Sequence, residues 1–315
     1  MYITDLDNTL LGTDGLLSDY SLKHLKELIK EVDVTFATAR SLFTSGVVLD
    51  FLEFKLPFIV SNGAAIIDPM KGYIHTFPID RTLFDQVIDL ELELNPFVIG
   101  VYKGSEILLH RTPKSEVERR HLIKRLDYND KRQTLVEEFD QVDEVLNLVY
   151  VGEFDEIIRI EDALSVFEGL TVYKYAKSKK ESNHYYLDIT SKEATKGNAV
   201  KALCELLNKP LKEVTAFGDD VNDISMFNVV GTPLMPKNSK LELDYMRIGP
   251  NGSDSALQWR DQSWPSPALA GQDNGRPWSW PCSRPFFRPP HDLAENCPLQ
   301  QPRLQPNSPV FRISV

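Results

Sequence analysis

The amino-acid sequence predicts an α/β protein with a parallel-sheet core, a second α/β domain inserted into that core, and an irregular C-terminal extension. Three observations lead to this prediction. Strand and helix patterns alternate over residues 1–65, give way to a mixed pattern over 66–186, and alternate again over 187–259. Residues 260–315 differ in composition from everything before them. The length of 315 residues suits about two domains, and an insertion explains the interrupted alternation better than two domains in series.

The first segment has the βαβαβ order that is typical of a parallel sheet. Residues 18–31 (SDYSLKHLKELIKE) show the helical spacing of apolar residues, with Ser18 or Asp19 as the N-cap. Ligands of such sheets bind at the carboxyl ends of the strands, where Asp5 and Thr38 are expected. Strands rich in apolar and β-branched residues are expected at 1–4 (MYIT), 32–38 (VDVTFAT) and 56–68 (LPFIVSNGAAIID), the last of which enters a turn at Asn62 and Gly63.

The later segments contain further elements of both kinds. The mixed segment predicts an amphipathic helix at 115–126 and a β-hairpin at 170–189. When the alternation returns, the expected elements are a helix at 196–208, a strand at 213–220, a helix at 222–228, a strand at 229–235, a helix near 238–246 and a closing segment at 248–259.

Composition and charge exclude several classes of protein. The chain is 42% hydrophobic and 26% charged, as soluble globular proteins are, and no apolar run approaches the ~20 residues that cross a bilayer. Acids at positions 5 and 7 argue against a secretory signal and favour a cytoplasmic location. A net charge of -11 repels nucleic-acid phosphates. The three cysteines show neither a zinc-binding spacing nor a disulfide framework.

The composition of the last segment sets it apart. Twelve of the twenty prolines and all four tryptophans lie from Pro250 onward, and the last lysine is Lys240. Because the prolines interrupt any helix or central strand, residues 260–315 are expected to be a largely disordered extension, translated out of frame or past a lost stop codon. The alternative is a genuine proline-rich segment that binds a partner.

Two pairs of acids follow predicted strands. Asp5 and Asp7 come directly after the first strand, and Asp219 and Asp223 follow the strand at 213–220. Four carboxylates at neighbouring strand ends make an oxygen-rich site, which suits Mg²⁺. Neither pair has the spacing of a calcium EF-hand loop, and the glycine fingerprints of nucleotide-binding loops are absent from the sequence.

Four short motifs then carry a resemblance to a known family. In order along the chain they are DLDNTLL (5–11), FATAR (36–40), TKGNAVKAL (195–203) and GDDVNDISMF (218–227). Together they resemble the four motifs of the haloacid dehalogenase superfamily, in its Cof-like sugar-phosphatase branch. The resemblance implies a Rossmann-like catalytic core at 1–65 and 187–259 and an inserted α/β cap at 66–186 that selects the substrate. Asn8 and Ala39 replace glycines that are common in this branch.

The resemblance also implies roles for the acids. Asp5 is expected to be the nucleophile that forms an aspartyl-phosphate, and Asp7 the general acid and base. Mg²⁺ is expected at Asp5, Asp219 and the backbone carbonyl of Asp7, with Asp223 orienting either the water ligands of the metal or Lys196.

The remaining candidates lie around the expected position of the substrate. Lys196 and the Thr38 hydroxyl would stabilise the equatorial oxygens of the phosphoryl group. Arg40 and Asn62 either contact the substrate or fix loops, and Asn222 is a further candidate for substrate binding.

The sequence therefore predicts a Mg²⁺-dependent phosphatase of small phosphorylated metabolites such as sugar phosphates, acting as a monomer or homodimer. Two alternatives stay open. One is a phosphotransferase or mutase on the same scaffold, in which a sugar replaces water as the acceptor. The other is a non-enzymatic protein that binds a ligand or a partner.

Overall fold

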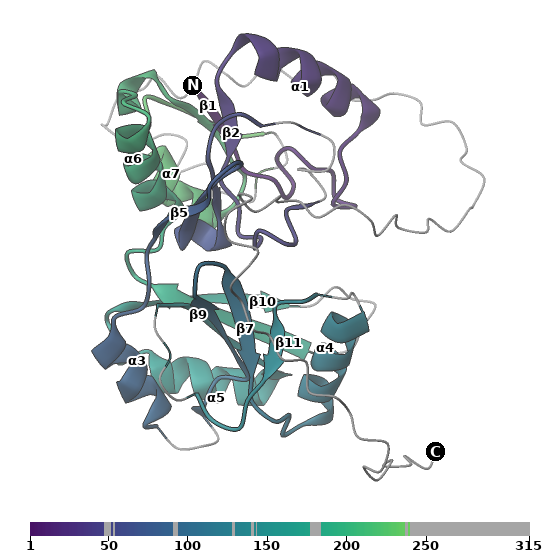
Figure 1. The fold of residues 1–315 in the computed structure, drawn as a ribbon, viewed down its shortest axis with the longest axis vertical. Coiled ribbons are helices and arrows are strands. Elements are labelled where there is room, and N and C mark those ends of the chain that lie inside the picture. Colours follow the sequence, from purple (N-terminus) through teal and green to yellow (C-terminus); the bar gives the residue numbers. More distant parts are fainter. Residues whose placement is uncertain are drawn as a thin grey trace, which may run out of the picture. The chain divides into compact units, whose positions relative to one another are not determined.

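The computed structural model of the chain describes residues 1–46, 52, 54–90, 94–127, 130–139, 142, 144–176, 184–236 and 239 (Figure 1). Apart from residue 239, the predicted helix at 238–246, the closing segment at 248–259 and the extension at 260–315 lie outside the described residues. Among the helices that are described, none is both long and apolar enough to cross a membrane.

The core contains the predicted parallel sheet. All of its neighbouring strands are parallel, and their order is β13-β12-β1-β2. The strands are β1 (Tyr2–Thr4), β2 (Val34–Phe36), β12 (Thr215–Phe217) and β13 (Thr232–Leu234). Strand β1 therefore lies in the interior of the sheet, between β2, which follows it in the sequence, and β12, which comes late in the described residues.

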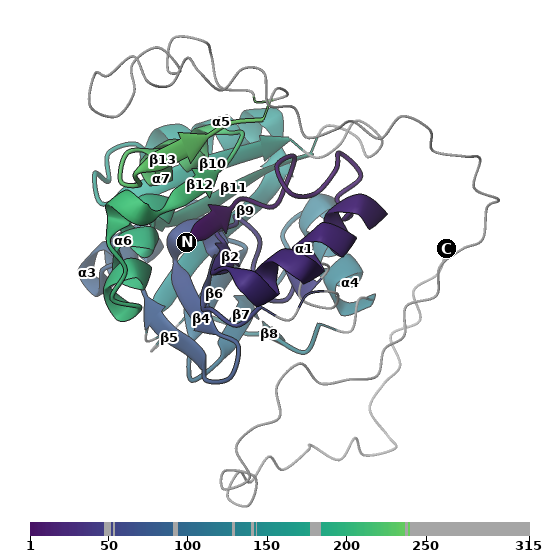
Figure 2. The same cartoon turned by 90° about the horizontal axis from the view of Figure 1, so that it is seen from above.

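Helices of the core pack on these strands. Helix α1 (Asp19–Glu31) begins as expected, because the Ser18 hydroxyl accepts a hydrogen bond from the Ser21 amide. Helices α6 (Lys196–Leu206) and α7 (Ile224–Phe227) lie side by side (Figures 1 and 2). Apolar side chains of the strands and of these two helices form one cluster, which includes Ile3, Ala216, Val200, Leu203, Met226 and Phe227.

A short antiparallel sheet follows the core strands. Strand β3 (Phe58–Val60) joins β2 through a parallel bridge between Ala37 and Ile59, and pairs with β4 (Ala65–Asp68), which pairs with β5 (Gly72–Thr76). The turn after β3 reverses the chain, so β4 runs back along β3. Most of β4 belongs to the predicted insertion at 66–186, which is therefore paired here with a strand of the first segment at 1–65.

A second, six-stranded sheet has the order β10-β11-β9-β6-β7-β8. Its strands are β6 (Val98–Tyr102), β7 (Glu106–His110), β8 (Gln133–Leu135), β9 (Val145–Glu153), β10 (Leu170–Ala176) and β11 (His184–Ser191). The predicted hairpin is present as the antiparallel pair β10 and β11. Since β11 runs to Ser191, the sheet also includes residues that the sequence assigned to the core. The domain boundaries at 65 and 187 stay predictions.

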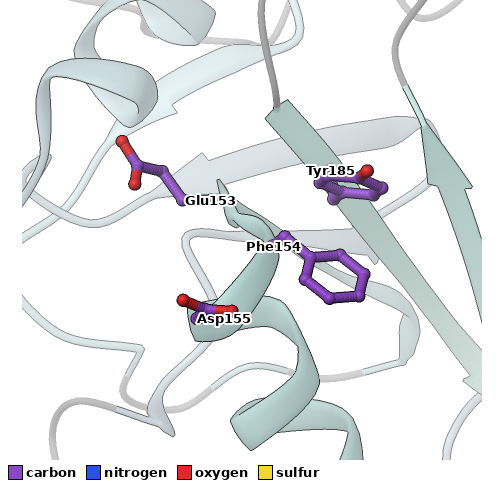
Figure 3. Close-up of a pocket in the computed structure, with 4 residues that line it drawn as sticks. All are labelled: Glu153, Phe154, Asp155 and Tyr185. Atoms are coloured by element: carbon purple, nitrogen blue, oxygen red, sulfur yellow. The ribbon is translucent and has the colours of Figure 1, made fainter.

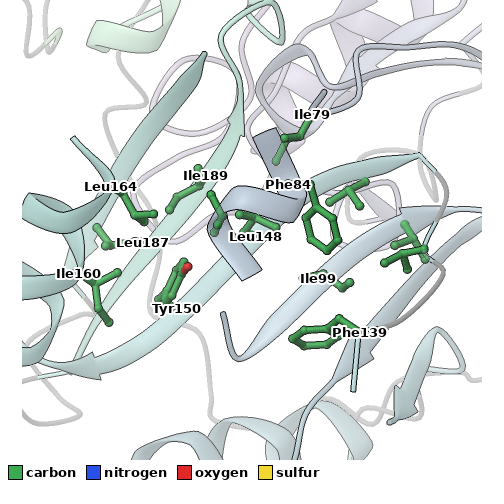
Figure 4. Packing of buried hydrophobic residues seen from close by; sticks show 14 of the residues in the cluster. Ile79, Phe84, Ile99, Phe139, Leu148, Tyr150, Ile160, Leu164, Leu187 and Ile189 are labelled. Carbon is green, nitrogen blue, oxygen red and sulfur yellow. The ribbon is translucent and has the colours of Figure 1, made fainter. Parts of the chain in front are cut away.

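Three helices pack on this sheet, and together with it they are called the cap below. They are α3 (Arg81–Ile88), α4 (Glu116–Asp127) and α5 (Phe154–Leu164). Side chains of α3 and α5 cover one face of the sheet and form the largest apolar cluster, in which Phe84, Ile160 and Leu164 meet Leu148, Leu187 and Ile189 (Figure 4). Helix α4 contacts the opposite face through Val117 and Leu122.

Candidate active site

The candidate site lies at the carboxyl ends of the core strands. Asp5 follows β1, Thr38 follows β2 and Asp219 follows β12. The Asp5 amide donates to the Phe217 carbonyl at 2.8 Å, which fixes the end of β1 against the end of β12. This edge is where open parallel sheets bind their ligands, so the predicted position of the site agrees with the fold.

Lys196 lies between two carboxylates. It is the first residue of α6, and the Thr195 hydroxyl caps the helix by accepting from the Asn198 amide. The Lys196 Nζ atom donates to Oδ1 of Asp5 and to Oδ1 of Asp223, each at 2.6 Å. The side chains of Lys196 and Asp223 have no exposed area and that of Asp5 has 8%. The ammonium group is thus shielded from water and held in place by both acids.

Burial and charge have opposite effects on the pKa values of Asp5 and Lys196. Burial raises the pKa of Asp5 to about 7, although the nearby Lys196 charge lowers it. For Lys196 burial alone would lower the pKa, but Asp5 and Asp223 together raise it above its ordinary value. Lys196 therefore stays charged, and its charge is available to a phosphate that binds beside Asp5.

Asp223 uses both of its oxygens within the protein. Oδ1 accepts from Lys196, and Oδ2 accepts from the backbone amides of Asp219 at 2.9 Å and Asp220 at 3.1 Å. Gly218 leaves the room for this, since a Cβ atom there would lie 2.4 Å from the Asp223 carboxyl carbon. The Asp220 side chain caps the short 3-10 helix at Val221–Asp223.

Asp7 has a different environment from Asp5. Its carboxylate accepts from Arg40 Nη2 at 2.6 Å and from Nε at 2.8 Å, and its side chain is 46% exposed. The Thr38 hydroxyl oxygen accepts from the Arg40 amide at 3.1 Å, so its own hydrogen is left for another acceptor. Arg40 thus holds the Asp7 carboxylate by two hydrogen bonds.

Asn62 and Asn222 are brought together. Asn222 Nδ2 donates to Asn62 Oδ1 at 2.9 Å, and the Asn62 amide donates to the Thr38 carbonyl at 3.0 Å. Asn62 has a left-handed backbone with φ of 55°, which asparagine tolerates better than most residues. Asn8, one of the two glycine replacements, likewise has φ of 58°, so its left-handed turn is kept without glycine.

The donor set fits a hard divalent cation. Carboxylate oxygens of Asp5, Asp219 and Asp223 lie within 4.8 Å of one another, and all are oxygen donors. Three carboxylates face the single charge of Lys196, so a cation would offset the remaining repulsion. Because Asp223 already binds Lys196 and two amides, a cation bound here would coordinate Asp5 and Asp219 more readily than Asp223.

Sequence reasoning missed some partners. The Thr9 hydroxyl donates to Asp219 Oδ1 at 3.0 Å, although the two residues are far apart in sequence. Thr9 belongs to the first motif, but nothing in its type or spacing distinguished it from a turn residue. The pairing of Asp7 with Arg40 was also missed, since it needs the ends of β1 and β2 side by side.

A hollow elsewhere on the cap is a poor phosphate site. It measures about 270 Å³ and is lined by Glu153, Phe154, Asp155 and Tyr185 (Figure 3). The Phe154 and Tyr185 rings pack together with centroids 5.1 Å apart. Two carboxylates without a cation in its lining would repel a phosphate, so the strand ends of the core remain the better site.

Comparisons with known proteins show the family of the chain. A family model of haloacid dehalogenase-like hydrolases matches residues 2–244. The chain is 25% identical over 261 residues to phosphatase YwpJ of Bacillus subtilis, covering 76% of this chain and 90% of the relative. It is 24% identical over 266 residues to the 5-amino-6-(5-phospho-D-ribitylamino)uracil phosphatase YwtE of the same organism, covering 76% and 88%. The fold resembles the crystal structure of TM0651 from Thermotoga maritima, with a TM-score of 0.61, 22% identity and coverage of 76% and 86%.

Proposed function

The chain belongs to the haloacid dehalogenase-like hydrolases and is a phosphatase, and we propose that it hydrolyses small phosphorylated metabolites such as sugar phosphates through a phosphorylated Asp5. The match over residues 2–244 and the named phosphatases among the relatives favour an enzyme over a non-catalytic binding protein. The observation that carries the proposal is the buried contact of Lys196 with Asp5, 2.6 Å long, at the strand ends.

Two transfers would complete the reaction. A carboxylate oxygen of Asp5 attacks phosphorus, the bond from phosphorus to the ester oxygen breaks, and Asp7 gives its proton to the departing alkoxide. Asp7 then takes a proton from a water that attacks the same phosphorus, which releases phosphate and restores Asp5. The exposure of Asp7, at 46%, is consistent with a group that exchanges protons with substrate and water.

Basic and neutral groups would stabilise the transferred phosphoryl group. Lys196 stays charged without water around it, so it acts at full strength on the equatorial oxygens. The Thr38 hydroxyl donates a further hydrogen bond. Asn62 and Asn222 are proposed to contact the substrate, while Arg40 holds Asp7 in position.

Mg²⁺ is the proposed cofactor. Asp5 and Asp219 would hold it together with the backbone carbonyl of Asp7, and Asp223 would act by orienting Lys196. When bound, the ion neutralises charge between the nucleophile and the phosphate. A cytoplasmic location and a monomeric or homodimeric state remain predictions from the sequence.

The test uses Asp5→Asn in the full chain with Mg²⁺ present. We expect phosphate release to fall by about 10³-fold or more, because an amide is a poor nucleophile. Asp19→Asn, an exposed aspartate at the start of α1, is the matched control and should keep the wild-type rate. Acid quenching of the wild-type reaction should trap a phosphoryl group on the peptide that contains Asp5.

Retention of a tenth of the wild-type rate in Asp5→Asn would exclude Asp5 as the nucleophile. Product analysis with a bisphosphorylated sugar added separates hydrolysis from transfer to a sugar, since hydrolysis releases inorganic phosphate whereas transfer gives a new sugar phosphate without releasing it.

A further inference from the structure

Among the described residues, one face of the cap sheet is only partly covered by a helix. Helix α4 contacts that face at Val98, Leu108, Val149 and Val151. Asp188 lies on the same face, next to the part that α4 contacts. Its neighbours across the sheet are Tyr173 on β10 and Val149 on β9. Beyond it, Thr190 lies opposite Asn147, which lies opposite Gly100. The face therefore changes from apolar to polar along the same strands.

The polar end contains hydrogen-bonding atoms that are not satisfied. Asn147 Nδ2 donates to Asp188 Oδ1 at 2.8 Å. Asn147 Oδ1 and Thr190 Oγ1 are buried and have no hydrogen-bond partner among the residues that the structure describes. A buried oxygen without a partner destabilises a fold, so two of them in register opposite each other call for an explanation.

Gly100 makes room for the Asn147 amide. A Cβ atom at position 100 would lie 2.1 Å from Asn147 Oδ1, which no ordinary contact permits. The amide therefore spans from β6 to Asp188 on β11 across the surface of β9. As whole residues, Asn147 and Asp188 are partly exposed, although Asn147 Oδ1 is buried.

This end of the sheet is next to the candidate active site. Leu146, the residue before Asn147, packs in one apolar cluster with Ala64 and Ala194. Those two alanines lie two residues from Asn62 and Lys196 in the chain. The charges of both places also act on one side chain, Tyr173. Burial and Asp188 raise the pKa of Tyr173, and the charge of Lys196 lowers it. The polar end of the cap sheet and the strand ends of the core therefore belong to neighbouring parts of the protein.

We propose that Asn147, Asp188 and Thr190 form a specificity subsite that hydrogen-bonds the hydroxyl groups of an uncharged polyol whose phosphate is bound at Lys196. This inference rests on the proposed function. The amide and carboxylate oxygens accept from hydroxyl groups, and the threonine hydroxyl donates to one. The carboxylate disfavours substrates that carry a second anionic group, such as a carboxylate or another phosphate.

The experiment compares three substrates by kcat/KM in the full chain with Mg²⁺. Sorbitol 6-phosphate has an uncharged polyol, 3-phosphoglycerate has a carboxylate, and p-nitrophenyl phosphate has neither. With Asn147→Ala we expect the loss on sorbitol 6-phosphate to exceed the loss on p-nitrophenyl phosphate by about tenfold or more. With Asp188→Asn the preference for sorbitol 6-phosphate over 3-phosphoglycerate should fall by about tenfold.

The matched control is Glu161→Gln, which also turns a cap carboxylate into an amide. Glu161 lies on α5, on the other side of the sheet, and pairs with Lys174. It should change neither ratio. Equal losses on all three substrates in folded Asn147→Ala and Asp188→Asn would overturn the subsite and assign these residues a structural role. If the wild-type chain hydrolyses p-nitrophenyl phosphate but does not prefer the polyol, the subsite fails and the proposed function stands; inactivity on every phosphate overturns both.

Discussion

Asp188 makes the stability of the cap dependent on pH. Burial raises its pKa from 3.8 to about 6, although the hydrogen bond from Asn147 acts in the opposite direction. Between these two pH values the unfolded chain ionises at Asp188 while the folded chain keeps the proton. Folding therefore becomes less favourable as the pH rises from about 4 to 6, and the penalty is complete above that range.

Asp188→Asn removes this penalty and keeps the shape. The amide oxygen of asparagine can still accept from Asn147 Nδ2, so the hydrogen bond of 2.8 Å is preserved. A pKa difference of about two units corresponds to ~3 kcal/mol, and at pH 4 only ~0.5 kcal/mol of it applies. The variant should be more stable than the wild type by ~3 kcal/mol at pH 8 and almost equal to it at pH 4.

Urea unfolding at pH 4 and pH 8, followed by circular dichroism, measures both differences. Glu161→Gln is the control, because this partly exposed carboxylate pairs with Lys174 at the surface and should change the free energy of unfolding by less than about 1 kcal/mol at either pH. A stability gain of Asp188→Asn that is the same at both pH values, or a loss at pH 8, would refute the reasoning.

Four further outcomes are expected. Asp7→Asn should slow hydrolysis of alkyl phosphates by about 10²-fold or more but that of p-nitrophenyl phosphate much less, since its leaving group needs little protonation; equal losses would make Asp7 a scaffold residue. Excess EDTA should abolish phosphate release, Mg²⁺ should restore it and Ca²⁺ should not, whereas full activity in EDTA would contradict the metal assignment. Gly218→Ala should lower kcat by about tenfold or more, because its Cβ would displace the Asp223 carboxylate 2.4 Å away and so release Lys196; unchanged kcat in the folded variant would contradict this. A chain without residues 260–315 should keep the wild-type kcat and remain folded, and loss of either would make this segment part of the working protein.

Local patterns allowed much of the fold to be predicted. Helix α1 and its Ser18 cap follow from the spacing and residue types of one short stretch. The parallel order of the core strands follows from their alternation with helices. The order of the cap strands could not be predicted in this way, because antiparallel strands pair by long-range packing that no short pattern specifies.

In the candidate site, too, local patterns predicted some features and long-range contacts determine the others. The types and spacing of Asp5, Asp7 and Asp219 marked the strand ends at once. The contact of Lys196 with Asp223 depends on the packing of α6 against α7, which no local pattern specifies. The hydrogen bond from Asn147 to Asp188 needs the room that Gly100 leaves on the neighbouring strand, and none of these residues belongs to a motif, so no sequence pattern pointed to it.

The interior position of β1 has a consequence for the order in which the protein is made. Its first neighbour, β2, leaves the ribosome soon after it, but its second neighbour, β12, begins at Thr215. Roughly 180 residues separate the two partners, and at about 5–20 residues per second their synthesis takes on the order of 10–40 s. During that interval one edge of β1 lacks its partner strand and Asp5 has no lysine beside it. The proposed catalytic centre can therefore assemble only after the entire cap has been synthesised, and we expect a chain interrupted before Lys196 to be inactive toward phosphate esters.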